Sequence, residues 1–345
     1  MKTNTSNPIL IGDIHLGKKF PYTNIKTAAR WENLKSQTLN KIMALEGTKL
    51  QAGDLFDSHS VDSATFVQGY LIAKQCEALL SGNHDISNNT EKSSAMDLLR
   101  QFNVNVVWEK PMMVDLGDTR FVMIPHQLTQ EKFDTLLASA KVMIAEGRKN
   151  VLILHCNYGL REGSETENYL RPEVAKELLS TQGKDFALKH FYHIVCGHEH
   201  NSSHPLVGVT MMGSVLPMDF GQMTDKYVWT EASQILTWSA KENYRKLDYM
   251  EFLDLGIDEP LQFIEITGTV VVAEAIMISK RIVEWYKQSS TLIAIKNNTL
   301  AHKVEASETE DKASNPDNWI SIVSAEMTEE EQVVFNELLG ESHAH

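Results

Sequence analysis

The amino-acid sequence predicts an α/β protein that carries a second, small domain of the α+β class. Three observations predict this fold. Short apolar runs alternate with amphipathic stretches through about residue 240, as strands and helices alternate in α/β domains. After a break at residues 255–260, residues 262–297 read as strand, helix and strand. The chain has 345 residues, which is enough for two domains that each bury a core.

Eight apolar runs are expected to form strands. In chain order they are PILIGD, KLQAGD, EALLSGN, VNVVWE, TRFVMIPH, NVLILHC, YHIVCGH and GVTMMGSV. Amphipathic stretches at residues 24–45, 62–78 and 131–146 lie between these runs and are expected to form helices. The first domain is therefore expected to span residues 1–250, and the small domain residues 251–300.

The C-terminal part of the chain predicts a linker followed by a short helix. Residues 301–326 are acidic and contain Ser, Asn and Pro, which favours an extended linker. In residues 327–345, Thr328 and Glu331 match a capping box, and Gly340 stands where a helix would end. This helix would carry an apolar stripe, formed by Val334, Phe335, Leu338 and Leu339. The stripe must be buried, either on the small domain or on a partner protein.

The charge of the chain limits its binding partners. The net charge is −14, and the residues from Lys303 onward contribute −9 of it. An acidic chain attracts nucleic acid poorly, so a phosphate-containing substrate needs local cations, metal ions or a partner. Lys18 and Lys19 are candidates for phosphate contact, with a solvated loop as the alternative.

Compartment and membrane signals favour a cytoplasmic protein. No run approaches 18 apolar residues, and the apolar stretch at the N-terminus is too short for a signal peptide. Cys76, Cys156 and Cys196 stand singly inside apolar runs, which is typical of buried thiols in a reducing compartment.

Metal-ligand side chains end five of the apolar runs. They are Asp13 and His15, Asp54, Asn83 with its neighbour His84, His155, and His198 with His200. Ligands of α/β proteins bind at the carboxyl ends of strands, so these residues are expected to converge. Seven oxygen and imidazole donors are too many for one ion and suit two ions bridged by a carboxylate, with manganese, iron or zinc as candidates. The remaining histidines are expected to be structural or exposed: His59, His126, His190, His193, His204 and His302.

The order of these blocks resembles that of the calcineurin-like metallophosphoesterases. The blocks are D-x-H, G-D-x-x-D, G-N-H-D, H and G-H-x-H, in that order across residues 13–200. Within that superfamily the chain is most similar to the SbcD-type DNA repair nucleases, because of GDLFDS, GNHD and the segment GSVLPMDFGQMTDK at residues 213–226. The resemblance implies a two-sheet metallophosphoesterase sandwich flanked by helices, a capping domain and a short C-terminal helix.

The resemblance also implies a role for each site residue. One ion would be held by Asp13, His15, Asp54 and His200, and the other by Asp54, Asn83, His155 and His198. Asp54 would bridge the two ions, which are expected to be Mn²⁺. His84 would face the scissile phosphate, and the carboxylate of Asp57 would orient it and raise its pKa.

The function implied is a two-metal DNA exonuclease and endonuclease that takes part in repair, recombination or replication. Its partners would be DNA, an SbcC-type SMC-like ATPase and a second copy of the chain, in a bacterial cell or in the host of a bacteriophage. The chain has no G-x-x-x-x-G-K-[ST] motif, so the ATPase would be a separate subunit. Two alternatives are a phosphomonoesterase or nucleotide phosphatase with the same metals, and a scaffold without turnover.

Overall fold

A computed structural model describes most of the chain. The described residues are 7–87, 93–160, 167–179, 190–230, 233–301 and 332. They form two compact units. Of the described residues, the first comprises those within 7–18, 37–218 and 224–238, and the second those within 19–36, 219–223 and 239–301. The expected boundaries at residues 250 and 300 stay a prediction, and the expected linker and C-terminal helix lie outside the described residues, apart from Ala301 and Gln332.

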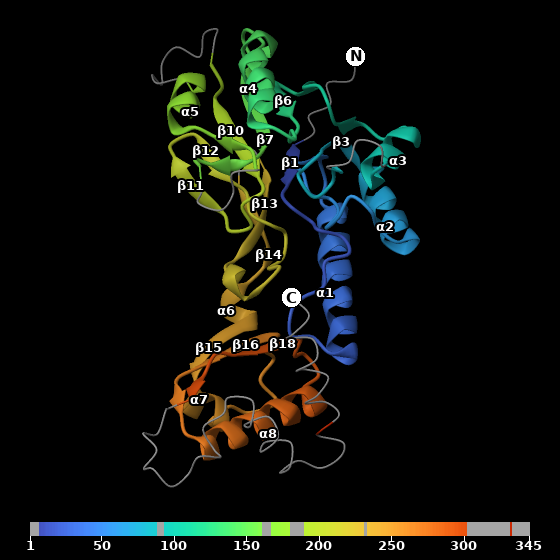
Figure 1. The fold of residues 1–345 in the computed structure, drawn as a ribbon. Helices are drawn as coiled ribbons and strands as arrows, with labels where there is room; N and C mark the ends of the chain where they lie inside the picture. The colour runs from blue at the N-terminus through green and yellow to red at the C-terminus, as the bar shows by residue number, and fades with distance from the viewer. Residues whose placement is uncertain are drawn as a thin grey trace. The chain divides into compact units, whose positions relative to one another are not determined.

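The first unit contains two six-stranded sheets (Figure 1). The first sheet has the order β14-β13-β1-β2-β3-β4, with β1 Pro8–Ile11, β2 Thr48–Gln51, β3 Cys76–Leu80, β4 Val106–Val107, β13 Lys226–Thr230 and β14 Gln234–Trp238. The second has the order β11-β12-β10-β7-β6-β5, with β5 Met112–Leu116, β6 Thr119–Ile124, β7 Lys149–His155, β10 His193–Gly197, β11 Ser203–Leu206 and β12 Val209–Met211. Strands β1 to β4 are parallel, as are β6, β7, β10 and β12.

The two sheets pack face to face and are covered by helices on their outer faces. Leu50 and Leu80 of the first sheet share a buried cluster with Met123, Ile153 and Val195 of the second. A second cluster places the outer face of the first sheet against α2 Ser63–Ala73, α3 Ala95–Gln101 and the C-terminal part of α1 Ile25–Ala44, through Leu39 and Ile42. A third places the outer face of the other sheet against α4 Gln130–Ser139, its extension η1 Ala140–Met143, and α5 Pro172–Leu178. The predicted two-sheet α/β sandwich is confirmed.

Local sequence explains where the helices start. Asp62 accepts hydrogen bonds from the backbone of Ala64 and Thr65 at the start of α2, and Ser94 forms a capping box with Asp97 at the start of α3. The second expected helix, at residues 62–78, is longer than the helix in the structure. Helix α2 ends at Ala73, and its last expected residues belong to β3.

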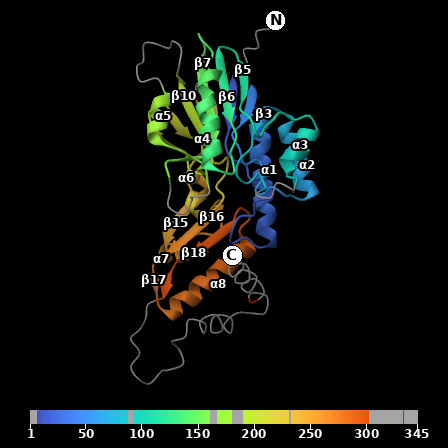
Figure 2. The same ribbon diagram turned by 45° about the horizontal axis from the view of Figure 1, so that its top comes forward.

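The second unit is built on a three-stranded parallel sheet of order β15-β16-β18 (Tyr244–Asp248, Phe263–Thr267 and Ala294–Asn297). Helix α8, Val272–Gln288, lies along one face of this sheet (Figure 2). Ile264 and Ile266 of the sheet pack there against Ile278 and Trp285 of the helix. The order strand, helix, strand expected for residues 262–297 is therefore present as β16, α8 and β18.

Short elements complete the described chain. They are β8 Asn157–Tyr158, β9 Tyr169–Leu170, η2 Phe220–Gln222, α6 Ala240–Asn243, α7 Tyr249–Asp254, β17 Thr269–Val270 and β19 Leu300–Ala301. Across the described ranges, none of the helices combines the length and the apolar character that crossing a membrane requires.

Candidate metal centre

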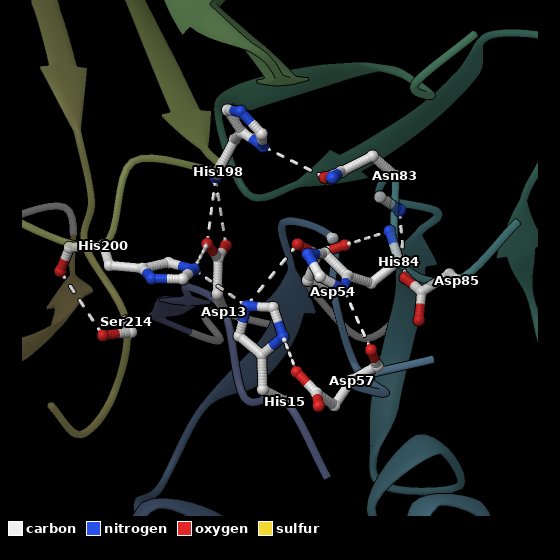
Figure 3. A network of polar contacts seen from close by, with 12 residues as sticks. Asp13, His15, Asp54, Asp57, Asn83, His84, Asp85, His198, His200 and Ser214 are labelled. Carbon is white, nitrogen blue, oxygen red and sulfur yellow. Dashed lines mark hydrogen bonds and ion pairs between the residues drawn. The ribbon is translucent and has the colours of Figure 1, made fainter. Parts of the chain in front are cut away.

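The predicted ligands lie together at the carboxyl ends of five strands (Figure 3). Three of these strands, β1, β2 and β3, are neighbours in the first sheet, and the other two, β7 and β10, are neighbours in the second. Parallel strands end at the same edge of a sheet, so each sheet presents its ligands at one edge. Three overlapping groups of side chains have donor atoms within 4.8 Å of one another: Asp13, His15 and His200; Asp54, His155 and His198; and a third, His15, Asp54 and His84, which includes a residue that was not predicted as a ligand.

The first group is centred on two imidazoles. Nε2 of His15 lies 2.9 Å from Nε2 of His200, and Nε2 of His200 lies 3.6 Å from Oδ2 of Asp13. Asp13 is fully buried and also accepts hydrogen bonds from the backbone N–H of His198 at 3.1 Å. Asp13 therefore contacts both histidines that follow β10.

The second group surrounds the amide oxygen of Asn83. This oxygen lies 3.0 Å from Nε2 of His155 and 3.0 Å from Nδ1 of His198. His155 is fully buried, and its other nitrogen, Nδ1, donates a hydrogen bond to the carbonyl of Ala52 at 2.9 Å. In a neutral imidazole only one nitrogen carries a proton, so Nε2 of His155 presents its lone pair to Asn83.

Asp54 lies between the two groups. Its Oδ2 is 3.5 Å from Nε2 of His15 and 3.2 Å from Nε2 of His155. The atom is buried and has no hydrogen-bond partner. The other oxygen, Oδ1, accepts the backbone N–H of His84 at 3.0 Å. Asp54 thus lies between the two groups of predicted ligands, where a carboxylate could reach two cations, and its bridging role stays a prediction.

The arrangement of these atoms fits bound cations. The amide oxygen of Asn83, Nε2 of a neutral His155 and Oδ2 of Asp54 are all hydrogen-bond acceptors, and they converge on one place, where only a second proton on His155 could act as a donor. Acceptors held at about 3 Å repel one another unless a proton or a metal ion lies between them. Oxygen and imidazole donors without thiolate suit Mn²⁺, Fe²⁺ or Zn²⁺. The residues present therefore fit a centre of two divalent ions.

The pKa shifts of His155 and Asp54 in the metal-free chain also favour positive charge at this place. Burial by itself would lower the pKa of His155, but the negative charge of Asp54, whose Oδ2 lies 3.2 Å from Nε2, raises it to about 10. Burial would likewise raise the pKa of Asp54, but His155 and His15 bring it well below its usual range. Without metal, a proton on His155 would thus occupy a position where the chain favours a cation.

The backbone at the ligands adopts an uncommon conformation. His15, Asp54 and His198 have positive φ angles of 49°, 54° and 89°. Such angles cost non-glycine residues free energy and recur at functional sites, where the surrounding structure enforces them. The carbonyl of Asp54 accepts the backbone N–H groups of Ile14 and His15, both at 3.0 Å, so the loops after β1 and β2 hold each other.

Asp85, the last residue of the G-N-H-D block, joins two of the loops that carry predicted ligands. Its buried carboxylate accepts the backbone N–H groups of Leu55 at 3.3 Å, Phe56 at 3.0 Å and Gly82 at 2.9 Å. Burial, with the nearby charge of Asp54, raises its pKa to about 7. Asp85 therefore ties the loop that carries Asp54 to the loop that carries Asn83 and His84.

The expected pairing of Asp57 with His84 differs in the structure. The main-chain carbonyl of Asp57 accepts the hydrogen bond from Nδ1 of His84, at 2.9 Å. The Asp57 carboxylate lies beside His15 instead, with Oδ1 at 3.3 Å from Nδ1, although the two atoms are not aligned as a hydrogen bond. The same oxygen is 3.4 Å from Nζ of Lys18. His84 is thus oriented by a neutral carbonyl, and the carboxylate acts on His15.

Two residues that the sequence did not indicate also lie against the predicted ligands. Glu167 has its Oε2 at 3.0 Å from Nε2 of His198, and that hydrogen bond helps to lower its pKa to about 2. His126, expected to be structural or exposed, is buried with its ring 6.3 Å from that of His155, and burial lowers its pKa to about 3. A lone carboxylate and a lone histidine carry no motif that could have revealed these contacts.

The other expectations for single residues have mixed outcomes. Cys156 and Cys196 are buried in the core as predicted, whereas Cys76 is only partly buried. His193 and His204 bind the hydroxyl of Thr210, at 2.8 Å and 3.1 Å, which is a structural role. His302 lies outside the described residues.

Comparison with known proteins agrees with the geometry. Residues 8–202, more than half of the chain, match the calcineurin-like phosphoesterase family. The matched region contains all the predicted ligands. No curated protein matches the chain. The match and the arrangement of the ligands lead to one conclusion: the chain belongs to the calcineurin-like phosphoesterase family of metal-dependent phosphoester hydrolases.

Proposed function

We propose that the chain is a two-metal DNA nuclease, with exonuclease and endonuclease activity, that acts as a cytoplasmic subunit of an ATPase-coupled repair or recombination complex. The observation that carries this proposal is the position of the segment whose sequence resembles SbcD-type nucleases. Ser214 donates its backbone N–H to the carbonyl of His200 at 3.1 Å, and Val215 donates to the carbonyl of Asp13 at 3.0 Å. This segment lies outside the family match yet contacts two of the proposed metal ligands.

The chain's own residues would hold both ions. Asp13, His15 and His200 would bind one ion, Asn83, His155 and His198 the other, and Asp54 both. When bound, two divalent ions, which we take to be Mn²⁺, activate water and neutralise charge that develops on the phosphoryl oxygens. The carbonyl of Ala52 keeps the imidazole of His155 oriented before substrate arrives.

His84 is the residue that we assign to the phosphate. Its Nδ1 is committed to the carbonyl of Asp57, so Nε2 is the nitrogen left to act. The ring lies edge-on to His15, with centroids 4.8 Å apart, beside the bridging Asp54. A protonated Nε2 would donate a hydrogen bond to a phosphate oxygen or give its proton to the leaving group. Lys18, 37% exposed at its side chain and next to Asp57, would contribute a cation for the DNA backbone.

Substrate choice tests the proposal. With Mn²⁺, the wild-type chain should hydrolyse linear DNA and bis(p-nitrophenyl) phosphate, and it should hydrolyse p-nitrophenyl phosphate more slowly. The Asp54→Asn chain should lose all of these activities, because the bridging carboxylate organises both ions. Fast hydrolysis of the monoester alone, with DNA left intact, would support the phosphomonoesterase alternative and overturn the nuclease assignment.

A second copy of the chain is a proposed partner, and an apolar surface on α2 and α3 supports it. Val67 and Leu71 on α2 are 54% and 59% exposed, and Phe102 beside α3 is 53% exposed. Helix α2 contains no charged residue, so two copies of this surface would not bring like charges together. The Leu71→Glu chain should sediment as a monomer at concentrations where the wild type is a dimer. An unchanged sedimentation coefficient would exclude this surface.

An SMC-like ATPase is the other proposed partner. The support is the resemblance alone, because the apolar stripe assigned to this contact falls within residues 327–345, of which the structure describes only Gln332. Deleting residues 325–345 should leave manganese-dependent cleavage of short substrates intact and abolish copurification with the ATPase. Full copurification of the truncated chain would overturn this docking role.

A further inference from the structure

Glu167 controls which nitrogen of His198 is free. Its Oε2 lies 3.0 Å from Nε2 of His198, and an ionised carboxylate can only accept a hydrogen bond. Nε2 of His198 must therefore carry the proton. In a neutral ring this leaves a lone pair on Nδ1, which lies 3.0 Å from the amide oxygen of Asn83. The carboxylate thus sets up two facing acceptors, an arrangement that favours a cation over a protein hydrogen bond.

We infer that Glu167 is a positioning residue that holds His198 in its metal-binding tautomer and strengthens the binding of one of the two ions. Hydrogen bonding from a carboxylate fixes the orientation of a ligating imidazole and increases its basicity. The inference rests on the two-metal centre of the proposed function and does not depend on DNA being the substrate.

The fold holds Glu167 in this position through the strand end that also supplies His155. Asn157, two residues after His155 and buried, donates from Nδ2 to the same Oε2 of Glu167 at 2.9 Å. The backbone N–H of Asn157 donates to the carbonyl of Asn168, also at 2.9 Å, which fixes the residue next to Glu167. The Glu167 side chain is 34% exposed, so these bonds hold it more than packing does.

The effect should be confined to one ion, because each histidine has its own support. His155 donates to the carbonyl of Ala52, and His15 has the carboxylate of Asp57 at 3.3 Å from its Nδ1. No such contact links Glu167 to the group of Asp13, His15 and His200 among the described residues. Loss of Glu167 should thus weaken the ion held by His198 and spare the ion held by His200.

The first measurement is calorimetric titration of the metal-free chain with Mn²⁺. Wild type should bind two ions, and Glu167→Ala should weaken one of the two binding events by about 10- to 100-fold, the usual loss when the partner of a ligating histidine is removed. Glu167→Gln, which can still accept a hydrogen bond but lacks the charge, should lie between them. Glu173→Gln on α5 removes one acidic charge from an exposed position and should bind as wild type does.

The second measurement needs no metal. Nitrogen-15 spectra of histidine-labelled, metal-free chain at about pH 8, where an ordinary histidine is neutral, report the tautomer of each ring. The His198 signal is identified by its loss in His198→Gln. Wild type should show the proton on Nε2, and Glu167→Ala should move it to Nδ1, where it can be donated to Asn83 Oδ1.

The two measurements separate the possible failures. If wild type binds two ions and Glu167→Ala changes neither the affinities nor the tautomer, the inference is overturned. If wild type binds no manganese, the proposed function fails, and the tautomer still decides the role of Glu167. If Glu167→Ala is unfolded, the manganese affinity of Glu167→Gln decides the question: one weakened binding event supports the inference, and two events of wild-type affinity overturn it.

Discussion

Replacing Gly53 by alanine should disrupt the metal centre by a displacement that the structure defines. Gly53 precedes Asp54 and has a φ angle of +104°. A Cβ added here would lie 2.1 Å from Nδ1 of His155, whereas ordinary van der Waals contact begins near 3.4 Å. The imidazole or the β2 strand end would have to move by the difference, about 1.3 Å, against a tolerance of about 0.2 Å for metal–ligand distances.

The magnitude has two parts. The left-handed backbone conformation costs alanine roughly 1–2 kcal/mol relative to glycine. Moving His155 also breaks its hydrogen bond to Ala52, which costs about 1 kcal/mol more and frees the ring. Removing a residue that only hydrogen-bonds to a metal ligand lowers metal affinity by up to roughly 100-fold. Here a predicted ligand itself is displaced, so Mn²⁺ affinity should fall by at least that factor.

Gly117→Ala is the matched control. Gly117 also has a positive φ angle, +59°, but a Cβ there meets no atom within 4 Å. Urea unfolding in the presence of a chelator should show a loss of about 1 kcal/mol for Gly117→Ala and a larger loss for Gly53→Ala. Calorimetry should show unchanged manganese binding for Gly117→Ala only. Two manganese ions bound by Gly53→Ala with wild-type affinity would refute the placement of His155 against the β2 loop.

Three further predictions concern single histidines. His84→Gln should keep both manganese ions and lose most turnover, because Nε2 of His84 is assigned to the phosphate; loss of metal by calorimetry would make His84 a ligand instead. The pKa of His155 is raised to about 10, so below that pH the metal-free ring carries a second proton, which manganese binding should displace. Manganese affinity should therefore fall as the pH falls. A calorimetric binding enthalpy that does not depend on the buffer would contradict this proton release. The pKa of His126 is lowered to about 3, so between pH 3 and 6.5 the unfolded chain binds more protons than the folded chain, and the free energy of unfolding decreases as the pH is lowered. In urea unfolding with chelator, lowering the pH from 7 to 5 should cost wild type about 2 kcal/mol more of that free energy than it costs His126→Phe. Equal losses would exclude a buried neutral His126.

The strands that could be predicted from the sequence differ physically from those that could not. Strands such as β7 and β10 are parallel to both neighbours and almost fully buried, so they read as continuous apolar runs. Within the two six-stranded sheets, four strands were not anticipated, and all four pair antiparallel with a neighbour: β5, β11, β13 and β14. In β14 exposed or half-buried residues dominate, so its apolar content is diluted by polar positions.

The site divides in the same way. The ligands could be predicted because each combines a characteristic residue type with a fixed place after a buried strand. Contacts made by Glu167 and Asp85 could not, since a carboxylate gains its meaning only from what it meets in three dimensions. The partner of His84 was misassigned for a related reason: sequence spacing identifies a residue, and here the main chain of Asp57 makes the contact that was expected of its side chain.

The construction of the centre from both sheets makes the packing between the sheets part of the metal site. Asn83 belongs to the end of β3, whereas His155 and His198 belong to β7 and β10, whose register pairs His155 with Gly197. The distances of 3.0 Å from the Asn83 oxygen to the two imidazoles therefore depend on how closely the two sheets approach. That approach is set by the apolar cluster between them, in which Leu80 precedes Asn83 by three residues and Val195 precedes His198 by three. Interiors packed at crystal-like density transmit displacements of a few tenths of an ångström, and metal ligands respond to shifts of that size. Residues that contact no ligand can thus alter the affinity for either proposed ion, because the group of Asp13, His15 and His200 also joins the end of β1 in the first sheet to the end of β10 in the second.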